Sequence, residues 1–492
     1  MGTAHHTTTI TRFVNRFFHT TTQHTPPLQL MNIYEVKRKI LSLKLQSALG
    51  IDGITPLMLR HLSRKALTYL TQLFNHLLRL GHFPAIWKRA KVIPVPKPNK
   101  PGTDPNSYRP ISLLSTLGKL FERILAARLT SFVNQRHLLP HTQFGFRKKH
   151  STVSQLARIT DYISRGYNLH KHSGMVFLDL DKAYDTVWIH GLLYKLIVFQ
   201  LPTYLLFIFK EYLEGRSFTV HLNEATSSPK TTPSGLPQGA VLSTTLFAIY
   251  ISDMPHTPQH TTGVICQWHL HSCPILANRH YSPPAHSRNF HIAPPFYQME
   301  TTSQYSQSRS HSLHSTSSCC PSTSPLPTHC YPVELPGLLL DPKLLFTRHL
   351  TSILHKATGI LCQLFPLLAW DSMLSIPNKI TLYKLRIRTV LTYTAPVWSN
   401  TSTSNYRHLQ ILQSKCLCVI GNYPSRTSIP RLHSALNVAP IRDFIYHLTD
   451  NFFSSCPAHP NTLILSIGNY TLADLHRQYK KYIHKRPKHL VL

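Results

Sequence analysis

The spacing of apolar residues predicts most of the regular structure in this chain. Residues 57–80 carry apolar side chains every three or four positions and stop at Gly81, a residue that commonly follows the end of a helix. Comparable patterns predict further helices over 33–49, 113–125, 154–166, 190–197, 204–213, 241–251, 347–368, 375–398 and 409–419. Short apolar runs at 92–95, 175–178 and 216–222 predict strands. The mixture indicates an α/β or α+β chain.

The charge of the chain limits its partners. It has 52 Lys and Arg against 19 Asp and Glu, a formal net charge of +33. Such an excess needs a polyanion or a membrane surface. The longest apolar run, 192–209, is short for a membrane span and is interrupted by Lys195, Gln200 and Pro202. We therefore expect a nucleic acid partner and no membrane. The N-terminus lacks a signal core, so we expect an intracellular protein of the nucleus or cytoplasm.

The nine cysteines all lie at or after Cys266, and none forms a CxxC pair. This pattern fits neither a disulfide framework nor a zinc knuckle and favours reduced thiols.

Three carboxylates follow the apolar strand at 175–178. Asp179, Asp181 and Asp185 fall within seven positions of a chain that has few acids. Carboxylates at the end of a buried strand are a typical start of a metal site, and Asp179 is the candidate ligand. For Asp181 and Asp185 we prefer a structural interpretation, in which Asp185 fixes a local turn and Asp181 is exposed.

Two cations stand out before this strand. Lys97 follows the strand at 92–95 in a strongly basic stretch, although such a stretch is more commonly a solvated loop. Arg109 lies in a Tyr-Arg-Pro segment, which we interpret as a rigid turn before a helix. An arginine held there suits a bidentate phosphate contact.

A third basic segment combines cations with aromatic residues. Its cations are Arg147, Lys148 and Lys149, and Phe144 and Phe146 stand beside them. Aromatic rings among cations are typical of single-stranded nucleic acid binding.

The Gly-Leu-Pro-Gln-Gly segment at 235–239 predicts a turn that permits close approach. Gly235 and Gly239 carry no Cβ, so the backbone and Gln238 can come close to a flat substrate. Taken alone, the segment also fits an ordinary turn before the helix at 241–251.

Six motifs in one order resemble the reverse transcriptases of non-LTR retrotransposons, the jockey-like and other LINE-type elements. They are GIDGITP (50–56), WKRAKVIPVPKP (87–98), YRPISLLSTLGKLFERIL (108–125), QFGFRKKHST (143–152), FLDLDKAYDTV (177–187) and GLPQGAVLS (235–243). The resemblance covers about 46–255 and resumes near 337. It implies a right-hand polymerase with fingers, a palm built on an antiparallel sheet with helices, and a helical thumb.

The resemblance also implies roles for single residues. Asp179 matches the palm carboxylate that binds two catalytic Mg²⁺ ions. Tyr184 matches the aromatic residue beneath the sugar, which excludes a 2′-hydroxyl. Gln238, with Gly235, matches the loop that holds the incoming nucleotide and the template. Arg109, and more weakly Lys97, match the triphosphate contacts. The implied partners are an RNA template, a DNA primer and deoxynucleoside triphosphates.

The resemblance suggests boundaries along the chain. We expect a disordered N-terminus (1–30), fingers and the start of the palm (31–174), the palm (175–255), a segment unlike the family (256–335), a thumb (336–370) and a basic helical region (371–492). The short N-terminal segment leaves no room for an endonuclease domain, so we interpret the chain as a fragment of a retrotransposon reading frame.

One family motif is missing. The family carries an aromatic-Ala-Asp-Asp turn soon after the GLPQG helix, and this chain has no Asp-Asp pair at all. From about 266 to 330 it is rich in Ser, Pro and His, and the family pattern then returns. We interpret this as a compensated frameshift. Met299-Glu300-Thr301 must be encoded ATG GAR ACN, which read one base later gives Trp and then Lys or Arg, as relatives have. An inserted metal-binding domain is the alternative, but the Cys and His spacings fit no zinc pattern.

The loss of the Asp-Asp motif predicts an impaired or inactive polymerase, because one carboxylate cannot offset the repulsion between two Mg²⁺ ions. It also predicts a palm sheet that lacks a strand pair. The alternative function is a nucleic-acid-binding remnant without catalysis. A group II intron maturase or telomerase-like enzyme shares the palm but fits the motifs less well.

Overall fold

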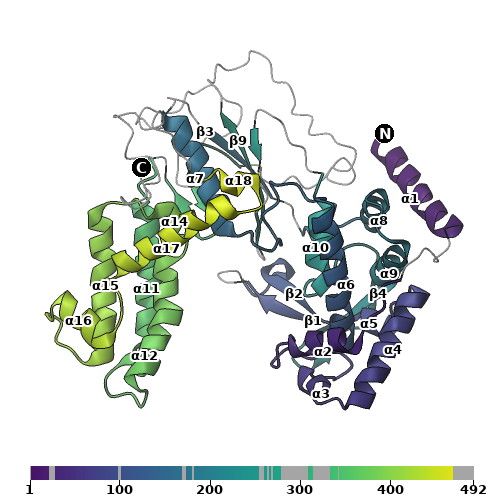
Figure 1. Cartoon of the computed structure of the whole chain (residues 1–492), viewed down its shortest axis with the longest axis horizontal. Helices are drawn as coiled ribbons and strands as arrows, with labels where there is room; N and C mark the ends of the chain where they lie inside the picture. Colours follow the sequence, from purple (N-terminus) through teal and green to yellow (C-terminus); the bar gives the residue numbers. More distant parts are fainter. Residues whose placement is uncertain are drawn as a thin grey trace. The chain divides into compact units, whose positions relative to one another are not determined.

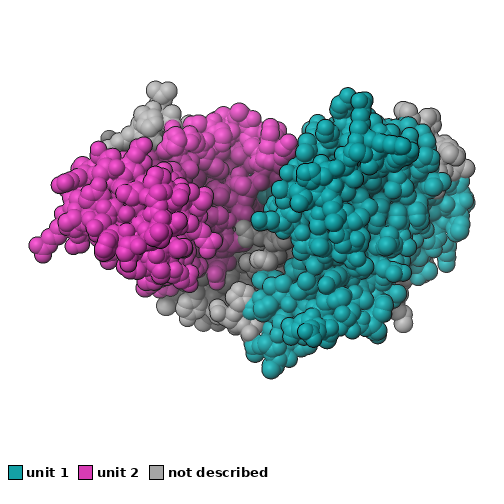
Figure 2. All heavy atoms as spheres, turned by 90° about the horizontal axis from the view of Figure 1, so that it is seen from below, with its two compact units in different colours: residues 1–146, 180–255, 289–306 teal, residues 147–179, 256–288, 307–492 magenta. Residues whose placement is uncertain are grey.

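The structure is a computed structural model that falls into two compact units (Figure 2). It describes residues 2–21, 28–97, 101–168, 173–179, 182–253, 260–262, 265–267, 270–278, 309–313, 333–341 and 343–468. Unit 1 comprises 1–146, 180–255 and 289–306, and unit 2 comprises 147–179, 256–288 and 307–492.

Unit 1 combines helices with a small sheet (Figure 1). Its helices are α1 (Gly2–Thr20), α2 (Ile33–Leu41), α3 (Pro56–Arg60), α4 (Arg64–Leu80), α5 (Ala85–Lys88), η1 (Pro105–Ser107), α6 (Thr116–Gln135), α8 (Ile189–Val198), α9 (Thr203–Leu213) and α10 (Val241–Tyr250). Its strands are β1 (Arg89–Pro96), β2 (Tyr108–Leu113), β4 (Arg216–Leu222), β5 (Ala225–Thr226) and β6 (Lys230–Thr232).

The sheet of unit 1 is mixed. Its order is β2-β1-β4-β5, and β6 also pairs with β4. Strand β1 runs antiparallel to β2 and parallel to β4. A small core joins the sheet to α10, because Val92, Leu114 and Ala240 are buried together with Phe218 packed against them. This core fixes where α10 begins relative to β2.

An aromatic cluster forms the centre of unit 1. Phe74 of α4, Phe121 of α6 and Tyr212 of α9 surround Phe83 and Trp87, with ring centroids 5.1 to 6.2 Å apart. All five side chains are at most 6% exposed. Large buried rings dominate core energetics, so this cluster anchors α4, α6 and α9 to one another.

The helix predicted over 57–80 is interrupted. It forms α3 and α4, because Ser63 takes extended backbone and its Oγ accepts a hydrogen bond from Ala66 N at 3.2 Å. This N-cap starts a new helix. The predicted end is confirmed, since Gly81 has φ +57° after Leu80. The helix predicted over 33–49 ends earlier, at Leu41.

The N-terminal segment differs from the expected disorder, because α1 spans Gly2–Thr20. Its Ile10 and Val14 are 4% and 0% exposed. Phe13 packs on Tyr194 of α8 with ring centroids 5.4 Å apart, and Phe18 packs on Phe207 of α9. The average composition of 1–30 is polar, but Ile10 and Val14 lie four positions apart on one side of the helix and are buried there, whereas Phe13 remains 46% exposed.

Unit 2 contains an antiparallel sheet, a β-hairpin and a group of helices (Figure 1). Its strands are β3 (Ser173–Asp179), β7 (His260–Thr262), β8 (Ile265–Gln267), β9 (Leu270–Asn278), β10 (Arg309–Leu313), β11 (Val333–Leu335) and β12 (Leu338–Leu340). Its helices are α7 (Thr152–Asn168), α11 (Thr347–Leu368), α12 (Ile376–Leu382), the π-helix η2 (Tyr383–Arg388), α13 (Thr389–Thr392), α14 (Ala395–Trp398), α15 (Thr403–Gly421), α16 (Ile429–Leu436), α17 (Ile441–Ser455), η3 (Cys456–Ala458) and α18 (Thr462–Leu465).

The sheet around β3 corrects the expectation of a missing strand pair. Its order is β10-β3-β9-β7, with β8 also paired to β9. Strand β9 pairs with the whole of β3, from Ser173↔Asn278 to Asp179↔Ser272. Ladder hydrogen bonds join backbone groups, so strands can form here although the sequence has lost the family pattern.

The helical prediction for the C-terminal half holds in part. The bounds of α11 equal the predicted 347–368, whereas the region 375–398 divides into α12, η2, α13 and α14. The end of the predicted basic helical region, residues 469–492, lies outside the described residues. None of the helices that the structure describes is long and apolar enough to cross a membrane. The domain boundaries stay predictions.

Candidate active site

Two segments about 50 residues apart in sequence are joined by backbone hydrogen bonds in unit 1. Gly235 N donates to Val187 O at 2.9 Å, and Leu236 N donates to Tyr184 O at 2.7 Å. The turn that starts at Lys182 thus lies against the Gly235–Gly239 loop. The sequence singled out both segments, and the structure brings them together.

Gly235 permits this contact. It has φ +89°, and a Cβ placed there would lie 2.7 Å from Asp185 O. A side chain would therefore be strained by its backbone conformation and would also collide with the opposite turn.

Gly235→Ala is expected to destabilise unit 1 by about 1–2 kcal/mol from backbone strain and by a further 1–3 kcal/mol or so from the collision. Gly215→Ala is the matched control, because Gly215 also has positive φ (+66°) but nothing lies within 4 Å of a Cβ there. Urea denaturation of both variants measures the difference. Equal losses for the two variants would show that the loop and the turn do not approach as closely as described.

Tyr184 lies half-buried between two other rings. It stacks on Phe247 of α10 with centroids 4.8 Å apart and planes at 23°, and Phe146 meets it edge to face at 6.4 Å. Rings held on two sides keep a fixed orientation. Phe144, which the sequence placed beside the cations as a stacking ring, is only 3% exposed and belongs to the core.

Gln238 is held from the neighbouring strand. Its carbonyl accepts a hydrogen bond from Ser112 N of β2 at 3.0 Å, and its Nε2 lies 3.5 Å from Asp185 Oδ1. Gly239, with φ +106°, brings its Cα close to the carbonyl of Ser112. Gln238 is half-buried. The loop therefore has a fixed backbone and a side chain that is partly accessible to a ligand.

Arg109 lies in a strand rather than in the predicted turn before a helix. It belongs to β2 and pairs with Val95 of β1. The following Pro110 is compatible with this position, because β2 is an edge strand. Arg109 is half-buried, and its guanidinium has no hydrogen bond or ion pair within the part of the chain that the structure describes. It remains available to an anion.

Lys97 follows the same strand pair but is already engaged. Its Nζ donates to Asn106 O at 2.9 Å, and its backbone N donates to Ser107 O at 2.7 Å. These contacts close the loop between β1 and β2. Lys97 is therefore a weaker candidate than Arg109 for a phosphate contact.

Glu122 of α6 supports the Gln238 loop, and sequence reasoning missed it. Its side chain is buried at 1% exposure, and Oε2 accepts hydrogen bonds from Val241 N at 2.7 Å and Leu242 N at 3.3 Å. The carboxylate thus caps α10 directly after the loop. Burial raises the pKa of Glu122, while the nearby charge of Arg216 and the two N–H groups oppose the increase. The available signal was a single acid among the apolar positions of the predicted 113–125 helix.

Asp179 belongs to unit 2, where it is the last residue of β3. In register it pairs with Ser272 of β9, which pairs in turn with Ile265 of β8. The sequence from 265 to 278 contains no carboxylate. Among the described residues no group of three or more His, Cys, Asp or Glu could hold a metal ion. Asp181 lies outside the described residues.

The three predicted nucleic-acid-binding cations also belong to unit 2. Lys148 and Lys149 are exposed, whereas Arg147 is partly buried, which lowers the pKa of its guanidinium. The carbonyl of Lys149 lies 3.0 Å from Nε2 of His459 near the C-terminal helices. This contact fixes the loop backbone and leaves both lysine side chains exposed.

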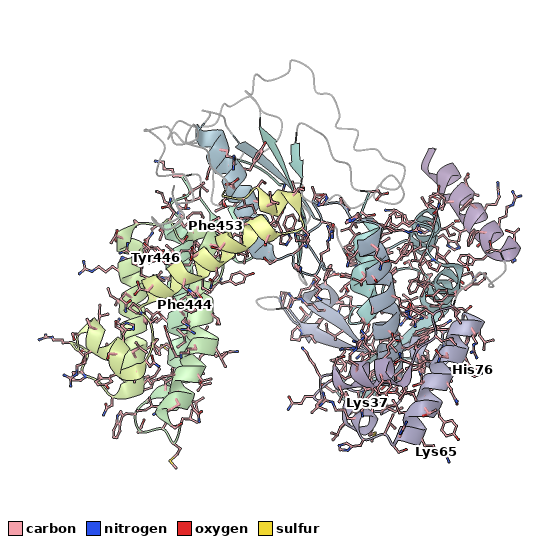
Figure 3. The ribbon with its side chains drawn as sticks, viewed as in Figure 1. Lys37, Lys65, His76, Phe444, Tyr446 and Phe453 are labelled. Atoms are coloured by element: carbon pink, nitrogen blue, oxygen red, sulfur yellow. The ribbon has the colours of Figure 1, made fainter. Side chains whose placement is uncertain are left out.

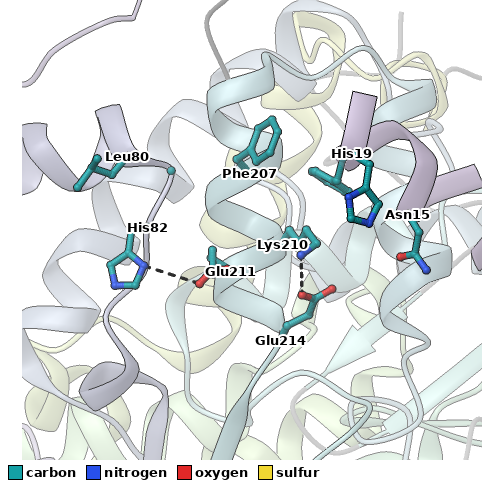
Figure 4. Close-up of a pocket in the computed structure, with 10 residues that line it drawn as sticks. Asn15, His19, Leu80, His82, Phe207, Lys210, Glu211 and Glu214 are labelled. Carbon is teal, nitrogen blue, oxygen red and sulfur yellow. Dashed lines mark ion pairs between the residues drawn. The ribbon is translucent and has the colours of Figure 1, made fainter. Parts of the chain in front are cut away.

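A separate pocket of about 370 Å³ opens in unit 1 among α1, α9 and the end of α4 (Figure 4). Two ion pairs line it, His82 with Glu211 at 3.8 Å and Lys210 with Glu214 at 2.9 Å. None of the candidate site residues contributes to it. The exposed ends of α1 and α9 form it, away from the loop of Gln238.

Comparison with known proteins agrees with the motif pattern. Residues 95–271 match the family described as reverse transcriptase (RNA-dependent DNA polymerase). The chain is 30% identical to the RNA-directed DNA polymerase from mobile element jockey of Drosophila melanogaster, over 97% of this chain and 54% of that protein. It is 29% identical to the probable RNA-directed DNA polymerase from transposon BS of the same organism, over 92% of this chain and 53% of that protein. A Pol polyprotein from retrotransposable element R2 of Popillia japonica is 35% identical over 29% of this chain and 18% of that protein.

The chain spans about half the length of the first two of these relatives. The family match ends at residue 271, inside β9 and shortly after the sequence loses the family pattern.

Proposed function

We propose an RNA-directed DNA polymerase function, because residues 95–271 of this chain belong to the reverse transcriptase family and most of the chain is similar to polymerases of non-LTR retrotransposons, as the motifs predicted. The observation that supports it best is the joined pair of segments in unit 1. They bring Tyr184, Gly235 and Gln238 together on a fixed backbone. The proposed ligands are an RNA template, a DNA primer and deoxynucleoside triphosphates.

The residues of unit 1 would bind and orient rather than react. The ring of Tyr184, fixed by Phe247, would lie beneath the sugar and exclude a 2′-hydroxyl. The half-buried Gln238 would contact the nucleotide and the template. The guanidinium of Arg109 would donate paired hydrogen bonds to the triphosphate, for which its planar fork is suited. Arg147, Lys148 and Lys149 would contact phosphates of the template or primer.

The metal site does not fit two ions. Polymerases of this family use Mg²⁺, which prefers oxygen ligands in octahedral geometry. Asp179 offers one carboxylate, and its register partners in β9 and β8 offer none. Asp179 would hold an ion, and the chemistry that such ions would supply is activation of the primer hydroxyl and neutralisation of the triphosphate charge. Because the donors for a second ion are missing, we propose that catalysis is strongly impaired.

A nucleic-acid-binding remnant without catalysis is the second candidate. The missing carboxylates favour it, and the net charge of +33 would still give binding to phosphates. We also propose an intracellular location, since an RNA template is found there.

Primer extension with oligo(dT) on poly(rA) separates the two candidates. We expect weak incorporation in Mg²⁺ or Mn²⁺ that disappears in Asp179→Ala, because Asp179 is the carboxylate proposed to bind the catalytic ions. Template binding by both proteins serves as the folding control. Binding with no incorporation by the unmodified chain would contradict the polymerase and support the remnant.

A further inference from the structure

The basic loop at 147–149 is held by contacts that span 310 and 311 sequence positions. Nε2 of His459 lies 3.0 Å from Lys149 O, and Nδ2 of Asn461 lies 2.9 Å from Nε2 of His150, the residue directly after the loop. The rings of His150 and His459 meet edge to face with centroids 5.2 Å apart. All of these residues belong to unit 2. We call His150, His459 and Asn461 the histidine–asparagine clamp.

The donors and acceptors of the clamp are mutually consistent. A carbonyl oxygen only accepts, so His459 donates its Nε2–H to Lys149 O and accepts at Nδ1 from Asn461 N at 3.0 Å. In the same way, His150 donates its Nδ1–H to Lys148 O at 3.1 Å and accepts at Nε2 from Asn461. The side-chain oxygen of Asn461 accepts from the backbone of α18 at 2.9 Å, which orients the amide. Each group therefore has the role that its neighbour requires.

The clamp is attached to the hydrophobic core of unit 2. Asn461 is 2% exposed and caps α18, and Cys456 and Ile464 on either side of it are 1% and 2% exposed. The end of this segment, Gly468, packs against Phe453, since a Cβ placed at Gly468 would lie 2.9 Å from that ring. Figure 3 shows Phe453 on α17. The clamp therefore has a support that does not depend on the loop.

Three successive carbonyls of the loop accept hydrogen bonds. Besides Lys148 O and Lys149 O, Arg147 O accepts from His150 N at 3.2 Å. Lys149 has φ +68°, a left-handed conformation that is unfavourable for a residue with a Cβ. Such a residue persists where its surroundings over-determine it, and these residues cluster at functional sites. Because glycine would adopt this conformation more easily, a lysine here points to a use for its side chain.

The cations of the loop have no acidic neighbours in either of the two segments that meet at the clamp. Residues 137–160 and 451–468 contain no Asp or Glu. Lys148 and Lys149 are exposed, and neither forms an ion pair with the residues that the structure describes. Exposed lysines that are not neutralised suit phosphate oxygens, which they bind as point charges. The clamp thus presents both lysines on a backbone that is fixed before a ligand binds.

We propose that the histidine–asparagine clamp positions Lys148 and Lys149 to bind the phosphodiester backbone of a nucleic acid strand. His459 and Asn461 are positioning residues, because they act through the loop. Their fixed contacts raise affinity, since the loop does not have to be ordered when the strand binds. The identity of the ligand rests on the proposed function, in which these lysines contact the template or the primer.

Fluorescence anisotropy of labelled oligo(A) RNA and labelled oligo(dT) DNA with the full chain tests the proposal. Lys148→Gln with Lys149→Gln should reduce the slope of log affinity against log salt by about 0.7 for each lost phosphate contact. His459→Ala should weaken binding about three- to tenfold at fixed salt, because the loop must then be ordered on binding. Its salt slope should be unchanged, since both lysines remain. The strand with the larger loss is the one that the loop contacts.

A double-mutant cycle distinguishes positioning from a general loss of binding. In the chain that already carries Lys148→Gln and Lys149→Gln, His459→Ala should cause no further loss of affinity, because its effect passes through the two lysines. His459→Gln should bind nearly as the unmodified chain does, since the glutamine amide can donate to Lys149 O in place of Nε2.

Two further variants make the test independent of any single substitution. His150→Ala breaks the bond to Lys148 O and leaves 456–468 unchanged, so it should weaken binding as His459→Ala does. His447→Ala is the matched control, because this exposed histidine of α17 also bonds an asparagine side chain, at 3.1 Å. It should bind both strands as the unmodified chain does. Thermal unfolding verifies that every variant is folded.

The outcomes separate the clamp from the proposed function. Unchanged binding by folded His459→Ala and His150→Ala, together with a loss in the double lysine variant, would overturn the clamp and leave the proposed phosphate contacts intact. Unchanged binding by the double lysine variant would remove those contacts from the proposed function, and the clamp with them. A loss for His459→Ala that persists without the lysines would also overturn the clamp, because the histidine would then act elsewhere.

Discussion

Restoring the family turn between β8 and β9 is expected to raise primer extension about 100-fold or more, the effect typical of a single key electrostatic group. The change is Gln267→Tyr, Trp268→Ala, His269→Asp and Leu270→Asp, which replaces the four residues before His271. Gln267 and Leu270 pair in register, and Asp179 stands opposite Ser272 two positions further along β9. The new carboxylate at position 270 would therefore stand close to Asp179 along the sheet.

The gain should depend on Asp179. Adding Asp179→Ala to the four substitutions should return incorporation to background, because the proposed ligand set combines Asp179 with the restored aspartates. A second control, Gln267→Tyr with Trp268→Ala alone, tests whether the turn acts through shape rather than charge. If the fourfold variant extends primers no faster than the unmodified chain, the missing carboxylates are not what limits catalysis.

Glu122→Ala is expected to reduce the free energy of unfolding by about 3 kcal/mol or more, because two buried N–H groups lose their acceptor. Those groups, on Val241 and Leu242, start α10 directly after the loop of Gln238. The same variant should weaken nucleotide binding, since the loop loses its support. Urea denaturation measures the first effect. A loss below about 1 kcal/mol, the size of an ordinary exposed cap, would contradict the role of Glu122.

Glu122→Gln separates the hydrogen bonds from the charge. Its amide oxygen can still accept from both N–H groups, so it should be much more stable than the Ala variant. The raised pKa of Glu122 means that the folded state holds this proton more tightly than the unfolded state does. Its contribution to stability is therefore complete below the ordinary glutamate pKa of 4.5 and is lost as the pH rises above it. Relative to the Gln variant, the unmodified chain should lose stability as the pH rises above about 4.5.

The parts of the fold that the sequence predicted are those with local signals. Helix α11 has the predicted bounds because its apolar spacing is regular, and Gly81 ends α4 with the expected positive φ. The motif around Asp179 correctly predicted a strand ending at that residue. Local pattern was sufficient in each case, since the segment itself carries the information.

The parts that the sequence did not predict depend on distant contacts. Helix α1 is polar on average, and its Val14 is buried by packing against other helices. Arg109 resembled a turn residue because Pro110 follows it, yet an edge strand tolerates that proline. Glu122 was overlooked because its partners lie 119 and 120 residues away. The contact between the loop of Gly235 and the turn of Asp185 was likewise not visible in either motif alone.

The most direct test of the incomplete metal site is a count of Mn²⁺ ions bound by the chain with template, primer and nucleotide, measured by electron paramagnetic resonance of free Mn²⁺. The fourfold variant with the restored turn should bind two Mn²⁺ ions, and adding Asp179→Ala should remove both. The unmodified chain should bind fewer than two Mn²⁺ ions whose binding depends on Asp179. Two Asp179-dependent ions on the unmodified chain would show that other ligands complete the site and would contradict the account.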